Sequence, residues 1–233
     1  MPRRGTAARG SSKRRKYGGR RVIGTPGFTR NVGNYGRYPK SKELKYHDTD
    51  VTIPGIAVAG SIIDTLNGVE QNTTEKTRVG RKIFIKRVQL RGEVSLPGLL
   101  AAGQTSTHGA RVRVIMYLDK QANGAAATPG VILQTTDINS WRDMEHVDRF
   151  RILYDKVHTL NRPTVTEEPA GTFQSPTVVK NFSMGKNCNI EILYSSPSGD
   201  VGNVQSNNIG MLFLSTETLI TEFTGTARIR YTD

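Results

Sequence analysis

Twelve Lys and Arg side chains occur within the first forty residues, and this stretch contains no Asp or Glu. They are Arg3, Arg4, Arg9, Lys13, Arg14, Arg15, Lys16, Arg20, Arg21, Arg30, Arg37 and Lys40. Guanidinium and ammonium groups bind phosphate, and a run of them without counter-charge attracts a polyanion. We therefore predict that residues 1–44 form a basic arm whose twelve cations bind nucleic acid.

Aromatic residues lie among these cations, notably Tyr17, Tyr35 and Tyr38. Cations that follow the phosphates, together with rings that stack on bases, are typical of proteins that bind single-stranded nucleic acid. The three tyrosines are therefore candidate base-stacking residues. Nothing in the arm indicates recognition of a base sequence. The alternative interpretation is a solvated basic tail without a defined ligand.

The tetrapeptide Lys13-Arg14-Arg15-Lys16 also has the composition of a nuclear localisation signal, which host nuclear import factors would bind. The arm contains few aliphatic residues and cannot bury enough apolar surface to offset its ordering entropy. We therefore expect it to be disordered in the absence of its ligand.

The rest of the chain is nearly neutral, because the twelve cations of the first forty residues leave 21 basic side chains against 20 acidic ones in residues 41–233, out of 33 and 20 in all 233 residues. Residues 45–233 are numerous enough to form one large domain or two small ones, and we predict one. No apolar run approaches the roughly 18–20 residues that span a bilayer, so we expect no membrane insertion. The N-terminus lacks the apolar region of a secretory signal. A single cysteine, Cys188, fits a reducing compartment.

No sequence pattern supports catalysis. The chain contains no G-x-S-x-G, H-E-x-x-H or Walker A sequence, and its four histidines are scattered. We therefore predict that the protein is not an enzyme and uses no cofactor or metal. An acidic group formed by Asp137, Asp143, Glu145 and Asp148 is interpreted as a solvated surface rather than a cation site.

From about residue 45 the chain alternates short runs rich in Val, Ile, Tyr and Thr with clusters of Gly, Pro, Asn and Ser, which is typical of antiparallel sheets. The strands expected are 46–53, 61–66, 81–96, 111–119, 149–160, 176–184, 188–195, 209–216 and 223–231. The apolar phase changes near Lys86 and Arg87, which predicts a bulge or bend. Eight or nine strands joined by several long loops predict an all-β, eight-stranded antiparallel jelly roll sandwich.

One short helix is expected over residues 137–147, where Ile138, Trp141 and Met144 recur at three-residue spacing. We interpret Trp141, the only tryptophan, as a hydrophobic plug beneath a long loop rather than a ligand-stacking residue. On the strands, Val112, Val114, Met116 and Leu118 are expected to face the core.

Four further arginines, Arg87, Arg91, Arg111 and Arg113, are expected on strand faces opposite the core. They would extend the basic surface of the arm, and the alternative is ordinary surface charge.

The order of these elements resembles the capsid proteins of small circular single-stranded DNA viruses that encode a replication initiator, geminivirus-like first and circovirus-like second. The resemblance depends on the basic N-terminus, strand order over residues 45–233 and four segments: 78–92, 111–120, 149–156 and 226–233. It implies a jelly roll subunit that assembles with its own copies into an icosahedral shell, most simply of sixty (T=1). It also implies packaging of single-stranded DNA by the inward arm, and residence in the virion and, during assembly, the host nucleus.

A host receptor is implied as well, but no residue identifies it. Two other classes fit the same residues. One is the capsid protein of a small single-stranded RNA satellite virus, because arm and sandwich are shared and the choice of DNA rests on the resemblance. The other is a cellular nucleic-acid-binding β-sandwich protein, which would remain a monomer or small oligomer.

Overall fold

The computed structural model describes residues 43–98, 109–162, 166–167, 173–174, 176–218 and 220–233. These residues form mainly strands. The elements are β1 (Lys45–Ile53), β2 (Ser61–Ile63), β3 (Lys82–Leu96), β4 (Gly109–Asp119), α1 (Pro129–Ile132), β5 (Phe150–Asn161), β6 (Thr166–Glu167), β7 (Phe173–Gln174), β8 (Val178–Tyr194), a 3-10 turn (Val201–Asn203), β9 (Val204–Ser206), β10 (Asn208–Ser215) and β11 (Glu222–Thr232).

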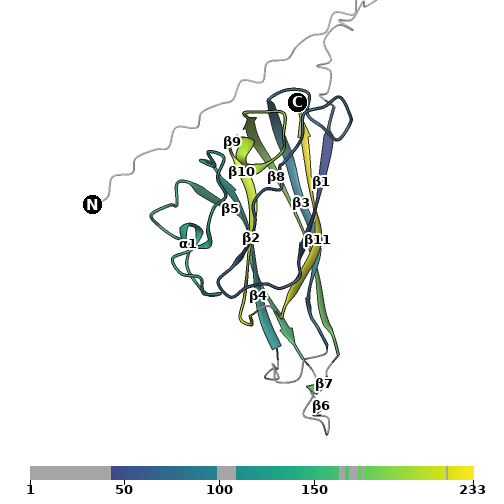
Figure 1. Ribbon diagram of the computed structural model, residues 1–233, viewed down its shortest axis with the longest axis vertical. Helices are drawn as coiled ribbons and strands as arrows, with labels where there is room; N and C mark the ends of the chain where they lie inside the picture. Colours follow the sequence, from purple (N-terminus) through teal and green to yellow (C-terminus); the bar gives the residue numbers. More distant parts are fainter. Residues whose placement is uncertain (1–42, 99–108, 163–165, 168–172, 175, 219) are drawn as a thin grey trace, which may run out of the picture. The chain divides into compact units, whose positions relative to one another are not determined.

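Two antiparallel sheets pack face to face (Figure 1). One has five strands in the order β1-β11-β3-β8-β9, and the other has four in the order β2-β10-β4-β5. When the short strands β6, β7 and β9 are left out, eight strands remain. One sheet is then formed by the first, eighth, third and sixth of them along the chain, which are β1, β11, β3 and β8. The second, seventh, fourth and fifth form the other. This connectivity confirms the predicted eight-stranded jelly roll.

Alternation along the strands places one apolar face of each sheet in the core. Val112, Val114, Met116 and Leu118 of β4 are all buried there, as predicted. The predicted change of phase in β3 is also confirmed: the register against β8 shifts between Ile85 and Arg87. Residues 86 and 87 are both exposed. The solvent-facing positions of β3 are therefore even-numbered before this point and odd-numbered after it.

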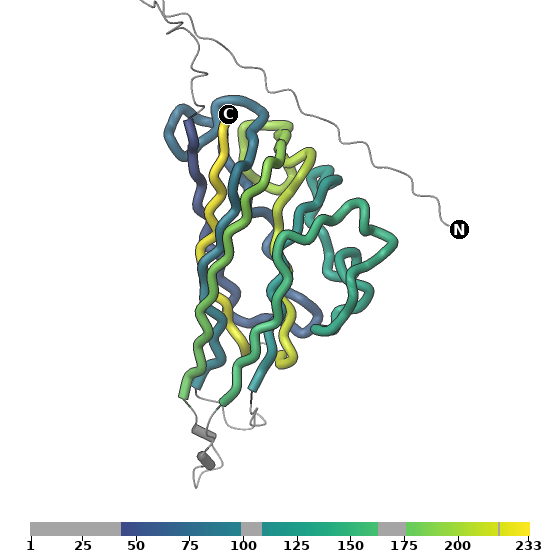
Figure 2. The backbone as a smooth tube through the Cα atoms, turned by 180° about the vertical axis from the view of Figure 1, so that it is seen from behind, coloured from purple at the N-terminus to yellow at the C-terminus, as the bar shows by residue number. Residues whose placement is uncertain are grey.

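A second apolar cluster lies on the outer face of the four-stranded sheet, where Ile115 and Tyr117 of β4 contact Ile132 and Leu133. The segment 120–149, which contains α1, therefore covers this face (Figures 1 and 2). Within the described residues, no helix combines the length and apolar character needed to cross a bilayer.

Three predictions about secondary structure and the Trp141 loop differ from the structure. The predicted helix over 137–147 is wrong, because turns and bends occupy that segment and the helix is the four-residue α1. The plug interpretation of Trp141 is wrong too: its exposed fraction is 81%, and that of Met144 is 67%. The strands predicted at 176–184 and 188–195 form the single strand β8.

Backbone hydrogen bonds explain the helix error. Leu133 and Arg142 form an isolated bridge, and the amide of Gln134 donates to the Trp141 carbonyl at 3.0 Å. The chain folds back on itself in a narrow loop, so the three-residue spacing does not place Ile138 and Trp141 on one side. Ile138 is buried, whereas Trp141 points to solvent.

Candidate nucleic-acid interface

The twelve cations of the arm and its three tyrosines all lie outside the described residues. Their roles in nucleic-acid binding, base stacking and nuclear import therefore remain predictions. The described part of the chain also carries a cluster of arginines on the outer face of the five-stranded sheet, which we call the basic face. Asp48, Asp50 and Glu93 lie on this face as well.

Strand pairing brings five of the residues on this face together. Arg228 of β11 is opposite Asp48 of β1 on one side and Gln89 of β3 on the other. In the next row, Arg230 of β11 lies opposite Arg87 of β3. Because side chains on one face recur every second residue, arginines from both strands project to the same side.

Arg228 is held in place by two neighbours. Its Nε and Nη2 donate to the two carboxylate oxygens of Asp48 at 2.6 and 2.7 Å. Its guanidinium also lies over the ring of Tyr46, 4.8 Å from the centroid. The hydrogen bonds to Arg228 lower the pKa of Asp48, so this carboxylate stays charged at neutral pH. Asp48 and Tyr46 therefore fix the position of the Arg228 side chain, of which 44% is still exposed.

Arg91 and Arg230 differ from Arg228, because neither forms an ion pair with a carboxylate in the described part of the chain. With Arg228 they line a pocket of about 320 Å³, to which Gln89 and Thr226 also contribute. A second pocket of about 590 Å³, whose lining includes Glu93, shares Arg91 and Thr226 with the first, and we call the two together the groove. A groove with three guanidinium groups favours an anionic ligand.

Arg87 lies beside this groove. A Cβ atom on Gly185 of β8 would be 3.1 Å from Nη2 of Arg87. The Arg87 side chain therefore extends over a place where β8 has no side chain. A glycine in the middle of this strand weakens its packing, and here it leaves room for a cation.

Two more cations flank a ring at another part of the same face. Lys82 and Lys86 place their ammonium groups 5.1 and 5.6 Å from the centroid of Phe84. Lys82 pairs with Glu191 at 2.6 Å, and Lys86 donates to the side-chain oxygen of Asn189 at 2.6 Å. Cations and rings thus alternate on the face, as they do in the sequence of the arm.

The four strand arginines that the sequence analysis placed in one group lie on two different sheets. Arg87 and Arg91 lie on the basic face, whereas Arg111 and Arg113 belong to β4 in the other sheet. Arg111 is exposed, but Arg113 is buried and paired with Asp155. The interpretation of Arg113 as part of a basic lining is therefore wrong.

Sequence reasoning missed Arg228 and Arg230 as members of the site. The signal was present, because both alternate with the buried Ala227, Ile229 and Tyr231. What the sequence did not indicate is that β11 lies between β1 and β3 in the sheet. Without this order, Arg228 and Arg230 are not adjacent to Arg87 and Arg91.

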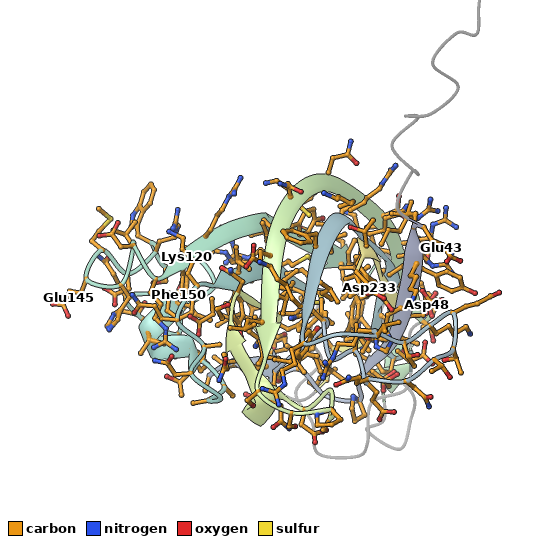
Figure 3. All side chains as sticks on the ribbon, turned by 90° about the horizontal axis from the view of Figure 1, so that it is seen from above. Glu43, Asp48, Lys120, Glu145, Phe150 and Asp233 are labelled. Carbon is orange, nitrogen blue, oxygen red and sulfur yellow. The ribbon has the colours of Figure 1, made fainter. Side chains whose placement is uncertain are left out.

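The acidic group lies on the other side of the sandwich. Figure 3 shows Asp48 and Glu145 on opposite sides of the described body. Side-chain atoms of Asp143, Glu145 and His146 approach one another within 4.8 Å, and His146 forms a hydrogen bond with Asp143. All three belong to an exposed loop, and exposed acidic groups of this kind are common without a bound ion.

Comparisons with known proteins add little. No family model and no curated protein matches the chain. A solved structure of Desmodium yellow mottle tymovirus is 9% identical, with a TM-score of 0.35 over 82% of this chain and 88% of that one. The 60-mer BFDV capsid protein is 10% identical, with a TM-score of 0.24 over 84% of each chain. Likeness this low carries no argument about function.

Proposed function

We propose that this chain is a viral capsid protein whose copies assemble into an icosahedral shell, most simply of sixty. In this proposal the arm, residues 1–44, packages a single-stranded DNA genome. The tetrapeptide Lys13–Lys16 brings the protein to the host nucleus, where the genome is packaged. The mature location is the virion.

The observation that carries the proposal is the separation of charge within one chain. The first forty residues carry twelve cations and no acid, whereas residues 41–233 carry 21 basic and 20 acidic side chains. A nearly neutral body can pack against its own copies without strong repulsion, while the arms neutralise phosphate and release counterions. With sixty copies, the arms would bring about 720 positive charges to one genome.

The fold supports the same function. Jelly rolls are used in viral capsids, although lectins and other proteins share them, so the fold alone does not select a function. The basic face of the five-stranded sheet favours the capsid proposal further. In a shell it would give the body a side suited to a packaged nucleic acid, opposite the loop that carries Glu145 (Figure 3).

Electron microscopy and nuclease treatment of the purified protein test the proposal. We expect particles tens of nanometres wide that contain nuclease-protected nucleic acid, which is degraded by deoxyribonuclease after the particles are opened. Nucleic acid degraded only by ribonuclease would favour the RNA satellite virus class. A protein that stays monomeric would favour the cellular nucleic-acid-binding class and contradict the capsid assignment.

A variant with the twelve arm cations replaced by Gln isolates the role of the arm, because it keeps the length of the chain. We expect it to fold and to lose most of the packaged nucleic acid. Equal nucleic-acid content in the two proteins would refute the role of the arm.

A further inference from the structure

We infer that the groove on the outer face of the five-stranded sheet is a second binding site for single-stranded nucleic acid, distinct from the arm. In this site Arg91, Arg228 and Arg230 bind phosphates and Tyr46 stacks on a base. The choice of nucleic acid as the ligand rests on the packaging function proposed above. The geometry of the groove carries the rest.

Charge selects an anion. Three guanidinium groups line a pocket of about 320 Å³, and only Arg228 has a carboxylate partner within the described residues. Arg91 and Arg230 each have up to five N–H donors in a planar fork, a geometry that matches two oxygens of a phosphate. Asp48 neutralises the charge of Arg228 and occupies its Nε and one terminal nitrogen, which leaves the other terminal nitrogen for a ligand. Asp50, which accepts a hydrogen bond from Thr226, and Glu93 also lie beside the groove, so the attraction for an anion depends on Arg91 and Arg230.

A free acceptor indicates a ligand with donors as well as phosphates. The side-chain oxygen of Gln89, which lines the pocket, is buried and accepts no hydrogen bond from the described residues. A buried acceptor without a donor costs about 1–3 kcal/mol. Phosphate diesters have no N–H or O–H to offer, whereas every nucleobase has an N–H donor on its edge. A nucleobase would supply this donor once a neighbouring side chain moves aside, because the Gln89 oxygen is closed to solvent in the structure.

Tyr46 makes the site suited to single strands. It stands opposite Arg230 at the edge strand β1, beside the pocket. Lys76 lies 5.6 Å and Arg228 lies 4.8 Å from its ring centroid, so cations that can bind the phosphates next to a stacked base lie beside the ring. Unpaired bases expose their π-faces to such rings, and stacked duplex bases do not.

The first experiment measures oligonucleotide binding with the full-length chain whose twelve arm cations are replaced by Gln. We expect residual binding of a single-stranded oligonucleotide, with a log–log salt slope of about −2 from three phosphate contacts. Adding Arg91→Gln and Arg230→Gln should abolish this binding. Arg111→Gln is the matched control for either replacement made alone, because it removes the same single charge from an exposed position on the other sheet.

The second experiment tests stacking. Tyr46→Leu should lower single-strand affinity about five-fold or more, Tyr46→Phe should restore it, and duplex affinity should not change. A 5-bromodeoxyuridine oligonucleotide cross-linked to the unaltered protein should modify Tyr46, as located by mass spectrometry. This readout does not require any variant to fold.

Cross-links confined to residues 1–40, with the Arg91/Arg230 variant binding as well as the Arg111→Gln control, would overturn the inference and leave the packaging role of the arm intact. Binding by the groove in a protein that never forms particles would support the inference and contradict the capsid assignment.

Discussion

Arg113 and Asp155 form a two-bond ion pair between β4 and β5, with Nε and Nη2 of the arginine at 2.8 and 2.6 Å from the two carboxylate oxygens. The remaining nitrogen, Nη1, donates to the backbone carbonyls of Ile138 and Ser140 at 3.1 and 2.7 Å. Arg113 thus joins two strands to the loop that carries Trp141. All three of its nitrogens are used.

Replacing Arg113 with Met should lower the free energy of unfolding by about 2–4 kcal/mol. The change leaves one carboxylate and two carbonyl groups without their donor beneath segment 137–141, and breaking one partner of a buried pair is costly. Urea denaturation of the unassembled protein measures the effect. Arg111→Met, at an exposed position on the same strand, should stay within about 0.5 kcal/mol. Equal losses for both variants would contradict the assigned role.

The sequence predicted the sandwich because strands such as β3 are buried on one side only, and their period-two alternation, with the phase change of β3 at Lys86–Arg87, can be read directly. β4 is buried on both sides beyond Arg111, so its apolar residues identify a strand but not the segment 120–149 that covers its outer face. The strand order, and with it the position of Arg228 beside Asp48, depends on contacts 180 residues apart that no local pattern encodes.

Buried cations were beyond sequence reasoning for the same reason. Arg78 is fully buried and donates to the carbonyls of Val69 and Gly80 at 2.8 and 2.6 Å. Arg113 and Asp155 are 42 residues apart in the chain. A charged side chain in the sequence is normally predicted to be exposed to solvent. Only the fold shows that backbone carbonyls or a distant carboxylate take the place of water as its hydrogen-bond partners.

Trp141 should report directly on its loop. Because its exposed fraction is 81%, Trp141→Ser should change the free energy of unfolding by no more than about 0.5 kcal/mol. As the only tryptophan, it should also be quenched by iodide in the unassembled protein nearly as well as free tryptophan is. A blue-shifted emission that iodide does not reach would mean that the side chain is buried.

His158 should make stability depend on pH. The side chain is 1% exposed, its ring centroid lies 4.6 Å from that of Phe182, and its Nδ1 has no partner within the described residues. Burial, followed by the charges of Lys156 and Lys180, lowers its pKa below the ordinary 6.5. The unfolded chain therefore binds a proton that the folded chain does not, and stability falls as the pH drops below about 6.5, by at most about 1.4 kcal/mol per pH unit.

Urea denaturation between pH 8 and pH 5 measures this dependence, over a range that lies above the ordinary carboxylate pKa values. His158→Phe should flatten the curve, because it keeps an aromatic ring against Phe182 and removes the titrating group. Burial also lowers the pKa of His47, so His47→Gln serves as the matched variant. It should remove only the contribution of His47 to the pH dependence of the free energy of unfolding. A curve unchanged by His158→Phe would show that this histidine does not titrate on unfolding.

Salt dependence should measure how many arm cations contact phosphate. If all twelve do so on a single strand, the arm should contribute about −8 to the slope of the plot of log binding constant against log salt concentration, to which the groove adds about −2. The slope should be the same for oligonucleotides of different sequence, since phosphate contacts carry no sequence information. Replacing only Lys13–Lys16 with Gln removes four cations and should reduce the slope by about 3. A slope near zero for the unaltered protein, or one that changes with base sequence, would mean that nucleic acid is not held by the charge of the arm.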